Sequence, residues 1–278
     1  MSVLVISRSR EDHAQRRQRE DDLAFLAASV GHDVVTLPHL YHLAEDAAVW
    51  RTLAALEQGS PVAVLAWLHP RPVQVLLEGH SAWGAGHRAF NLATEDETGL
   101  WAEVAAALGQ PAGSGSGAVT VASEPVRNRW YPLVDAERCT QCGRCQQFCI
   151  FGVYALDEAG RLGVANPDRC KPGCPACSRI CPHSAIMFPL YGKDPAIAGA
   201  PGLVVQPDAA TRRMWYQRTG KPCPACARSG AWAAGGPETS CPECGRAGWP
   251  IVAKAPADDL DGLIADLDRL DGRGGRHA

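Results

Sequence analysis

Short apolar runs rich in valine alternate with longer amphipathic segments over the first 110 residues. The valine-rich runs lie at residues 3–6, 34–37 and 62–65, and the segments of helical periodicity at 11–30, 44–58 and 95–108. Strands that alternate with helices are typical of a parallel sheet covered by helices. We therefore predict a small α/β domain over residues 1–110.

Further along the chain the apolar segments become shorter. We expect strands at 130–134 and 186–188, and a hairpin of strands 153–156 and 161–164 that turns at residues 157–160. Together they predict an α+β module.

Near the C-terminus, leucine and isoleucine recur at helical spacing with aspartate between them, which predicts a short amphipathic helix within residues 258–278. Its acidic polar face favours packing on the protein itself over binding to a membrane, and we expect the glycine-rich end of the chain to fray.

Composition divides the chain further. Residues 1–110 contain no cysteine and carry a net charge of −6, from 8 basic and 14 acidic residues. A Gly/Ser-rich linker is predicted at 111–125, a module with 9 basic and 6 acidic residues at 126–195, and a smaller cysteine-containing module at 204–254. The whole chain has a net charge of −3, which gives no strong attraction to nucleic acid or to anionic membranes.

No segment indicates a membrane span or a secretory signal. The longest apolar runs, such as residues 61–68, are far shorter than the roughly 20 residues that a transmembrane helix needs. The apolar start of the chain is followed at once by charged residues.

Each of the twelve cysteines is separated from another by two or three residues, a spacing typical of metal thiolates rather than of disulfides. We therefore expect a cytoplasmic, metal-containing protein.

Eight of the cysteines form two similar runs, C-x2-C-x2-C-x3-C and C-x3-C-x2-C-x3-C. These cysteines are Cys139, Cys142, Cys145 and Cys149 in the first run, and Cys170, Cys174, Cys177 and Cys181 in the second. Three thiolates on a tight loop can bind three iron corners of one cubane cluster, while the fourth, on the following helical turn, points away from it. The two runs therefore predict two [4Fe–4S] clusters within residues 126–195.

The two runs, with Pro182 after the last cysteine and a strand expected on either side, resemble the bacterial-type 2[4Fe–4S] ferredoxin family over about sixty residues. The resemblance implies two similar halves in which the fourth cysteine of each run binds the cluster of the other run. Cluster one would then be bound by Cys139, Cys142, Cys145 and Cys181. Cluster two would be bound by Cys149, Cys170, Cys174 and Cys177.

Two features depart from the family pattern. Ile150 takes the place of the proline that usually follows the first run, and Lys171, Pro172 and Gly173 make the first interval of the second run one residue longer. Both changes concern the loop around a cluster, so they bear on its reduction potential more than on its existence.

Two other kinds of metal site fit the same cysteines less well. The longer interval gives the second run the spacing of radical-SAM enzymes, but Cys149 is available as a fourth ligand and too little chain follows for their barrel. Two zinc sites are disfavoured because zinc knuckles rarely crowd four cysteines into so short a run.

The remaining four cysteines, Cys223, Cys226, Cys241 and Cys244, form two CxxC knuckles. Two such knuckles can place four sulfurs around one ion, as in a zinc ribbon, where Zn²⁺ has a structural role. A rubredoxin-like iron centre is the alternative, and the short intervening loop favours zinc. The basic and aromatic residues just upstream, including Arg212 and Arg213, could contact nucleic acid, but a solvated basic face over core aromatics explains them more simply.

The N-terminal domain offers fewer signals. It contains no P-loop, and residues 84–89 match only a loosened dinucleotide fingerprint outside the first βα unit. His39, His42 and His69 could converge at the carboxyl edge of the sheet and hold a metal or a tetrapyrrole. Histidines that cap strands and pack against neighbouring aromatic residues are the simpler interpretation.

These patterns predict an iron–sulfur electron-transfer protein with two [4Fe–4S] clusters and a structural zinc, which passes electrons to a redox partner protein. A non-catalytic carrier or redox subunit is favoured over an enzyme. The first alternative is a reductase whose N-terminal α/β domain binds a substrate or cofactor. The second is a redox-sensing or nucleic-acid-associated regulator.

Overall fold

The structure is a computed structural model that describes residues 2–11, 13–43, 46–56, 61–111, 118–120 and 128–205. Three predictions lie outside these residues: the zinc-ribbon-like knuckles with Cys223, Cys226, Cys241 and Cys244, the basic and aromatic segment before them, and the C-terminal amphipathic helix. No helix within the described ranges is both long enough and apolar enough to cross a membrane.

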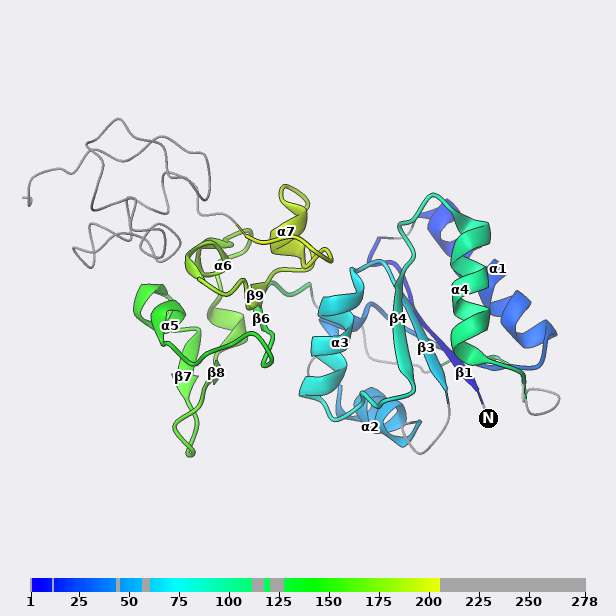
Figure 1. Ribbon diagram of the computed structural model, residues 1–278, viewed down its shortest axis with the longest axis horizontal. Helices are drawn as coiled ribbons and strands as arrows, with labels where there is room; N and C mark the ends of the chain where they lie inside the picture. Colours follow the sequence, from blue (N-terminus) through cyan, green and yellow to red (C-terminus); the bar gives the residue numbers. More distant parts are fainter. Residues whose placement is uncertain are drawn as a thin grey trace, which may run out of the picture. The chain divides into compact units, whose positions relative to one another are not determined.

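A parallel sheet of five strands organises the N-terminal part of the chain (Figure 1). Its strands are β1 (Val3–Ser7), β2 (Asp33–Leu37), β3 (Val62–Ala66), β4 (His87–Asn91) and β5 (Ala118–Thr120), in the order β4-β3-β1-β2-β5. All neighbours pair in parallel. Strands β1 and β3 are buried along their whole length, which is why they consist almost entirely of Val, Leu, Ile and Ala.

Helices cover both faces of this sheet. They are α1 (Ala14–Ser29), η1 (Leu40–His42), α2 (Ala47–Ala55), α3 (Pro70–Gly79) and α4 (Glu97–Leu108). Alternate residues of β1 enter two separate apolar cores: Val3 and Val5 pack with α2 and α3, whereas Leu4 and Ile6 pack with α1 and α4. The parallel α/β layer predicted from the sequence is thus confirmed.

The short helix η1 and three longer-range elements of this layer, α3, β4 and β5, were not predicted. Helix α3 begins at Pro70, a residue suited to the first helical turn because that turn needs no N–H donor there. Strand β4 follows, and the residues of the loosened dinucleotide fingerprint lead into it rather than into a helix. Strand β5 lies inside the segment predicted as a linker, where it extends the edge of β2.

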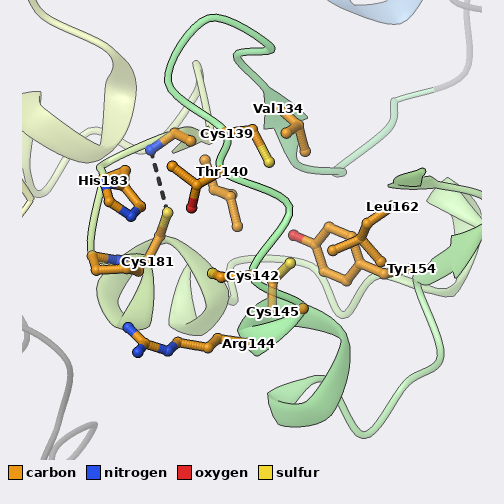
Figure 2. A pocket seen from close by; sticks show the side chains of 14 residues that line it. Val134, Cys139, Thr140, Cys142, Arg144, Cys145, Tyr154, Leu162, Cys181 and His183 are labelled. Atoms are coloured by element: carbon orange, nitrogen blue, oxygen red, sulfur yellow. Dashed lines mark hydrogen bonds between the residues drawn. The ribbon is translucent and has the colours of Figure 1, made fainter. Parts of the chain in front are cut away.

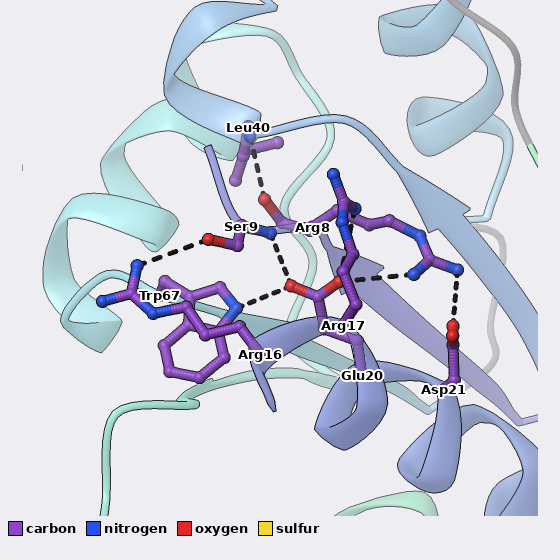
Figure 3. A network of polar contacts seen from close by, with 9 residues as sticks. Arg8, Ser9, Arg16, Arg17, Glu20, Asp21, Leu40 and Trp67 are labelled. Carbon is purple, nitrogen blue, oxygen red and sulfur yellow. Dashed lines mark hydrogen bonds and ion pairs between the residues drawn. The ribbon is translucent and has the colours of Figure 1, made fainter. Parts of the chain in front are cut away.

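A buried carboxylate holds the loop after β1 against the sheet (Figure 3). The side chain of Glu20, on α1, has no solvent exposure. It accepts hydrogen bonds from the backbone N–H of Ser9 and from Nε1 of Trp67, the latter at 2.7 Å, and forms an ion pair with Arg8 at 3.3 Å. The Arg8 guanidinium and the two N–H donors stabilise a carboxylate charge that would be costly to bury alone. Because Ser9 follows β1 and Trp67 follows β3, these contacts join α1 to the ends of both strands.

The cysteine-rich module consists of short elements. Strands β6 (Leu133–Val134) and β9 (Ile186–Met187) pair antiparallel, and β7 (Tyr154–Leu156) and β8 (Leu162–Val164) form the expected hairpin. Its helical turns are α5 (Arg144–Phe148), η2 (Pro167–Arg169), α6 (Ala176–Ile180) and α7 (Pro195–Ala198). The hairpin closes because the Asp157 carboxylate accepts bonds from two backbone N–H groups of the turn and Gly160 adopts a φ of +75°.

The sheet layer and the cysteine-rich module are joined by a shared core and by polar contacts. Tyr131, Leu133 and Met187 of the module belong to the same apolar core as α2 and α3. The rings of Tyr41 and Tyr131 stack with their centroids 4.4 Å apart, and each hydroxyl bonds to the backbone of the other residue.

Candidate iron–sulfur cluster site

The first cysteine loop is shaped by a residue in the left-handed region. Gly143 has a φ of +70° and precedes the first turn of α5. A side chain would be strained there, so the glycine allows the chain to turn tightly between Cys142 and Cys145. Gln141 also has a positive φ, of 56°, and its side-chain oxygen accepts a 2.6 Å bond from the backbone N–H of Leu162. The loop is thereby fastened to β8.

Four of the predicted ligands meet around one cavity (Figure 2). Cys139, Cys142 and Cys145 come from the first run, and Cys181 comes from the end of the second. The structure therefore brings together the four cysteines that the resemblance assigns to cluster one, although they come from two distant segments of the chain.

Backbone and side-chain donors face these sulfurs. The backbone N–H of Ala185 donates to Sγ of Cys181 at 3.3 Å (Figure 2), and Nε2 of Gln141 lies 3.5 Å from Sγ of Cys139. Donors of this kind stabilise negative charge on sulfur, which is one way in which a protein tunes an iron–sulfur centre.

Burial, together with the charges of Cys181, Cys139 and Cys142, raises the pKa of the Cys145 thiol to about 12. Burial also raises the pKa of Cys181. Thiols that are hard to ionise when bare lose their protons when a metal binds them, because the metal replaces the proton as the positive partner. A bound metal would therefore have to supply the positive charge that keeps Cys145 and Cys181 as thiolates.

The other four cysteines form a second group. Burial raises the pKa of Cys170 to about 12, with further contributions from the charges of Cys174 and Cys149. Burial raises the pKa of Cys177 too, and the charges acting on it come from Cys170, Cys149 and Cys174. Cys149, from the end of the first run, thus lies close to cysteines of the second run.

The extra residue of the second run is accommodated in a closed turn. The backbone N–H of Cys174 donates to the carbonyl of Lys171 at 3.1 Å. Pro172 and Gly173 occupy the two central positions, and Gly173 has a φ of +75°. Pro followed by Gly is the preferred pair at the centre of a type II turn, so the longer interval adds a turn without moving Cys170 away from Cys174.

Tyr154 is a residue of this site that the sequence pattern did not single out. It is 5% exposed, lines the cavity of the first group, and directs its hydroxyl at the thiol of Cys177. The thiols of Cys177, Cys145 and Cys149 all act on it electrostatically. Its hydroxyl therefore lies between the two groups of cysteines. Alternation along β7 predicts a buried side chain here, but only the tertiary fold shows what it faces.

The histidines of the N-terminal domain take up different positions. The rings of His39 and His42 lie 4.9 Å apart, buried next to Tyr41. Nδ1 of His69 lies 3.4 Å from the side-chain amide of Asn91. In the part of the chain that the structure describes, no three His, Cys, Asp or Glu side chains are placed to hold a single metal ion.

The donor set fits iron–sulfur clusters. Eight thiols in two groups, the N–H donors at sulfur and a cavity lined by four of the thiols match what such clusters require. A bound [4Fe–4S] cluster supplies reversible one-electron transfer. The protein's own residues bind it, shield it from water and set its potential through N–H···S contacts.

Comparison with known proteins agrees with this description. The profile of the 4Fe-4S binding domain matches residues 130–149. An uncharacterized ferredoxin of Methanocaldococcus jannaschii is 44% identical over 22% of this chain and 41% of its own length. Ferredoxin-3 of a Nostoc species is 34% identical over 20% of this chain and 79% of its own length. The pyruvate synthase subunit PorD of M. jannaschii is 40% identical over 20% of this chain and 62% of its own length.

These similarities concern about a fifth of the chain, and the chain spans 41% of the length of the first of these relatives. No solved structure matches the chain. The family profile, the relatives and the cysteine-lined cavity all point to the same segment. The chain therefore belongs to the ferredoxin family of 4Fe-4S electron-transfer proteins, and its cysteine-rich module binds at least one such cluster.

Proposed function

We propose that the protein is an electron carrier that holds two [4Fe–4S] clusters, bound in the crossover arrangement. The observation that carries this proposal is the sorting of the eight thiols into two groups of four, each made of three cysteines of one run and the fourth of the other. Its own residues would bind and shield the clusters, and electrons would pass to a redox partner protein without bond chemistry on this chain.

The number of clusters is tested by anaerobic purification followed by iron and sulfide analysis and EPR. We expect about eight irons per chain and, after reduction, the broadened EPR signal of two neighbouring paramagnetic clusters. A value of about four irons would contradict the two-cluster proposal, and iron-free protein would overturn it altogether.

The crossover is tested by paired double variants. Cys142→Ser with Cys181→Ser removes two proposed ligands of the same cluster, so about half of the iron should remain. Cys142→Ser with Cys149→Ser removes one ligand from each cluster and should lower the iron content more. If the fourth cysteine of each run instead bound the cluster of its own run, the two results would be exchanged.

The second metal site is also a proposal. Cys223, Cys226, Cys241 and Cys244 would hold one structural Zn²⁺ in a ribbon. Metal analysis should give about one zinc per chain in addition to the irons, and that zinc should be lost when Cys241→Ser is combined with Cys244→Ser. A ninth iron in place of zinc would indicate the rubredoxin-like alternative.

A specific contact favours the reductase as the second candidate function. Cys170 packs against both the module's core and the core shared with α2 and α3, and it acts electrostatically on Tyr41, whose ring stacks on Tyr131. An electron acceptor bound to the sheet layer would therefore lie near cluster two. A flavin, nucleotide or tetrapyrrole that copurifies with the protein and is reduced by it would support this function.

One of the relatives also bears on the redox partner of this protein. This relative is a subunit of pyruvate synthase. We propose that this chain delivers its electrons to a protein partner.

A further inference from the structure

Two large apolar side chains are exposed directly after one of the proposed ligands of cluster two. Ile150 is 75% exposed and Phe151 is 36% exposed, and they follow Cys149, which is itself half-buried. Single exposed apolar residues are ordinary, but neighbouring ones beside a functional centre are typical of a protein-binding surface. Here Ile150 takes the place of the proline that ferredoxins usually carry after the first run.

Positive side chains border this apolar pair. Arg169 and Lys171, on either side of Cys170, are both exposed. Nη1 of Arg169 lies 3.6 Å from the point where a Cβ on Gly152 would stand, which places the guanidinium beside residues 150–152. The segments are held together by the side-chain amide of Asn166, which donates to the carbonyl of Gly152 at 3.0 Å.

The local charge is not neutralised by the nearest carboxylate. Asp168 forms an ion pair with Arg129 at 3.0 Å. Within the part of the chain that the structure describes, neither Arg169 nor Lys171 takes part in an ion pair. The exposed rim next to Cys149 and Cys170 is therefore basic, in contrast to the acidic sheet layer.

We infer that this surface, formed by Ile150, Phe151, Arg169 and Lys171 and named here the basic cluster-two face, is the docking site for a redox protein that presents an apolar contact ringed by carboxylates. Such a partner would cover the apolar pair and match the charge of the rim. Electron transfer weakens steeply with distance, and a partner docked beside the half-buried Cys149 and Cys170 would lie close to cluster two. The inference rests on the proposed second cluster.

The test uses one haem protein in two charge states. Native cytochrome c is basic, and succinylation of its lysines makes it acidic while the haem stays the same. One electron passes from the reduced full-length protein to the ferric haem, which becomes ferrous, and no proton or bond is exchanged. The rate is followed by stopped-flow absorbance, and binding to the oxidised protein by isothermal titration calorimetry.

We expect the succinylated cytochrome to bind more tightly and to be reduced faster than the native one. The difference between the two reduction rates should shrink as salt is added. Arg169→Glu with Lys171→Glu should lower its association rate about tenfold at low salt and favour the native cytochrome instead. Arg51→Glu with Arg88→Glu, an equal change of charge on the exposed surface of the sheet layer, should have little effect.

The apolar pair is tested separately. Ile150→Ser with Phe151→Ser should weaken binding of the succinylated cytochrome at all salt concentrations, whereas Leu156→Ser, at another exposed apolar residue of the module (58% exposed), should not.

Iron content and EPR of every variant are measured first, because they separate two kinds of failure. A parent protein without the second cluster would overturn both the proposed function and this inference. A parent with both clusters, but with equal rates for the two cytochromes or equal losses in the control variants, would overturn the docking surface alone.

Discussion

At the scale of single residues, Tyr154 differs most from what its sequence position indicates. Tyrosine in a short strand is ordinary core material, yet this hydroxyl is directed at the thiol of Cys177. A neutral thiol is a weak hydrogen-bond acceptor. The thiolate of a bound cluster would accept a stronger hydrogen bond from the same hydroxyl.

Tyr154→Phe should therefore lower the reduction potential of cluster two. The hydroxyl would stabilise the added negative charge of the reduced state, and phenylalanine keeps the ring but removes the donor. We expect the reduced-to-oxidised ratio at a given potential to fall about tenfold, which equals 59 mV for one electron. The measurement is an EPR-monitored redox titration.

Tyr191→Phe is the matched control for that titration. Tyr191 belongs to the same module, but its hydroxyl already contacts Arg179 at 3.0 Å. Tyr191→Phe should leave the reduction potentials of both clusters unchanged. Equal potentials in the Tyr154 variant and the parent would show that the hydroxyl does not contact the cluster.

At the scale of elements, η1 shows how a short helix after a strand can bury groups that would otherwise titrate. It places His42 in the core, where Nδ1 accepts a 3.1 Å bond from the backbone N–H of Arg129. Burial lowers the pKa of His39 to about 3 and that of His42 to about 4, and nearby arginines act in the same direction. Both imidazoles are therefore neutral in the folded protein at neutral pH.

This arrangement predicts a loss of stability in mild acid. An unfolded chain takes up a proton at each histidine below a pH of about 6.5, while the folded chain does not until the pH falls to about 3 or 4. Stability is thus highest above pH 6.5 and falls as the pH drops through the window below it.

His39→Leu should remove part of this dependence. Near pH 7.5 the free energies of unfolding of the variant and the parent should differ only by the cost of replacing the side chain. At pH 5 this difference should shift by about 2 kcal/mol in favour of the variant, because its unfolded state no longer takes up the proton at position 39. Urea unfolding followed by far-UV circular dichroism measures the effect, and parallel curves at the two pH values would contradict it.

At the scale of the whole molecule, one arginine joins the sheet layer to the cysteine-rich module. Arg71, at the start of α3, donates from Nε to the Asp135 carboxylate at 2.7 Å and from Nη2 to the carbonyl of Ser184 at 2.7 Å. Its side chain is 14% exposed and that of Asp135 is 9% exposed. The same Asp135 accepts backbone N–H bonds that shape the chain before Cys139.

Arg71→Ala should destabilise both parts together. Removing the guanidinium leaves the buried Asp135 carboxylate with a 3.7 Å contact to the half-exposed Arg138 as its remaining ion pair, and the loss of such a buried hydrogen-bond partner typically costs about 1–3 kcal/mol. Thermal unfolding should shift to lower temperature by the same amount whether it is followed by circular dichroism or by the visible absorbance of the clusters. The exposed Arg51→Ala is the control. A shift in only one of the two signals would mean that the parts unfold independently.

Local patterns were enough to predict much of this molecule. Cysteine spacing depends on a few consecutive residues and on the size of the cluster, so it indicated the ferredoxin family without knowledge of the fold. The turn at Asp157 and the valine-rich strands are also local, since they follow from hydrogen bonding within a turn and from burial on both faces of a sheet. The crossover assignment remains a prediction that the grouping of thiols supports.

Other features were decided only by the tertiary structure. Glu20 looks like a solvated helix residue among arginines, and it is buried because distant donors from Ser9 and Trp67 meet it. Strand β5 is too short to be distinguished from a linker until β2 offers it an edge. The placement of Tyr154 between two groups of thiols, and of Arg71 against Asp135, likewise depends on segments far apart in the chain. Sequence alone thus determined the chemistry that neighbouring residues carry, such as the cysteine runs. The surroundings of the cysteines and the contacts that join the two parts of the protein depend on residues far apart in the chain, and local periodicity does not encode such contacts.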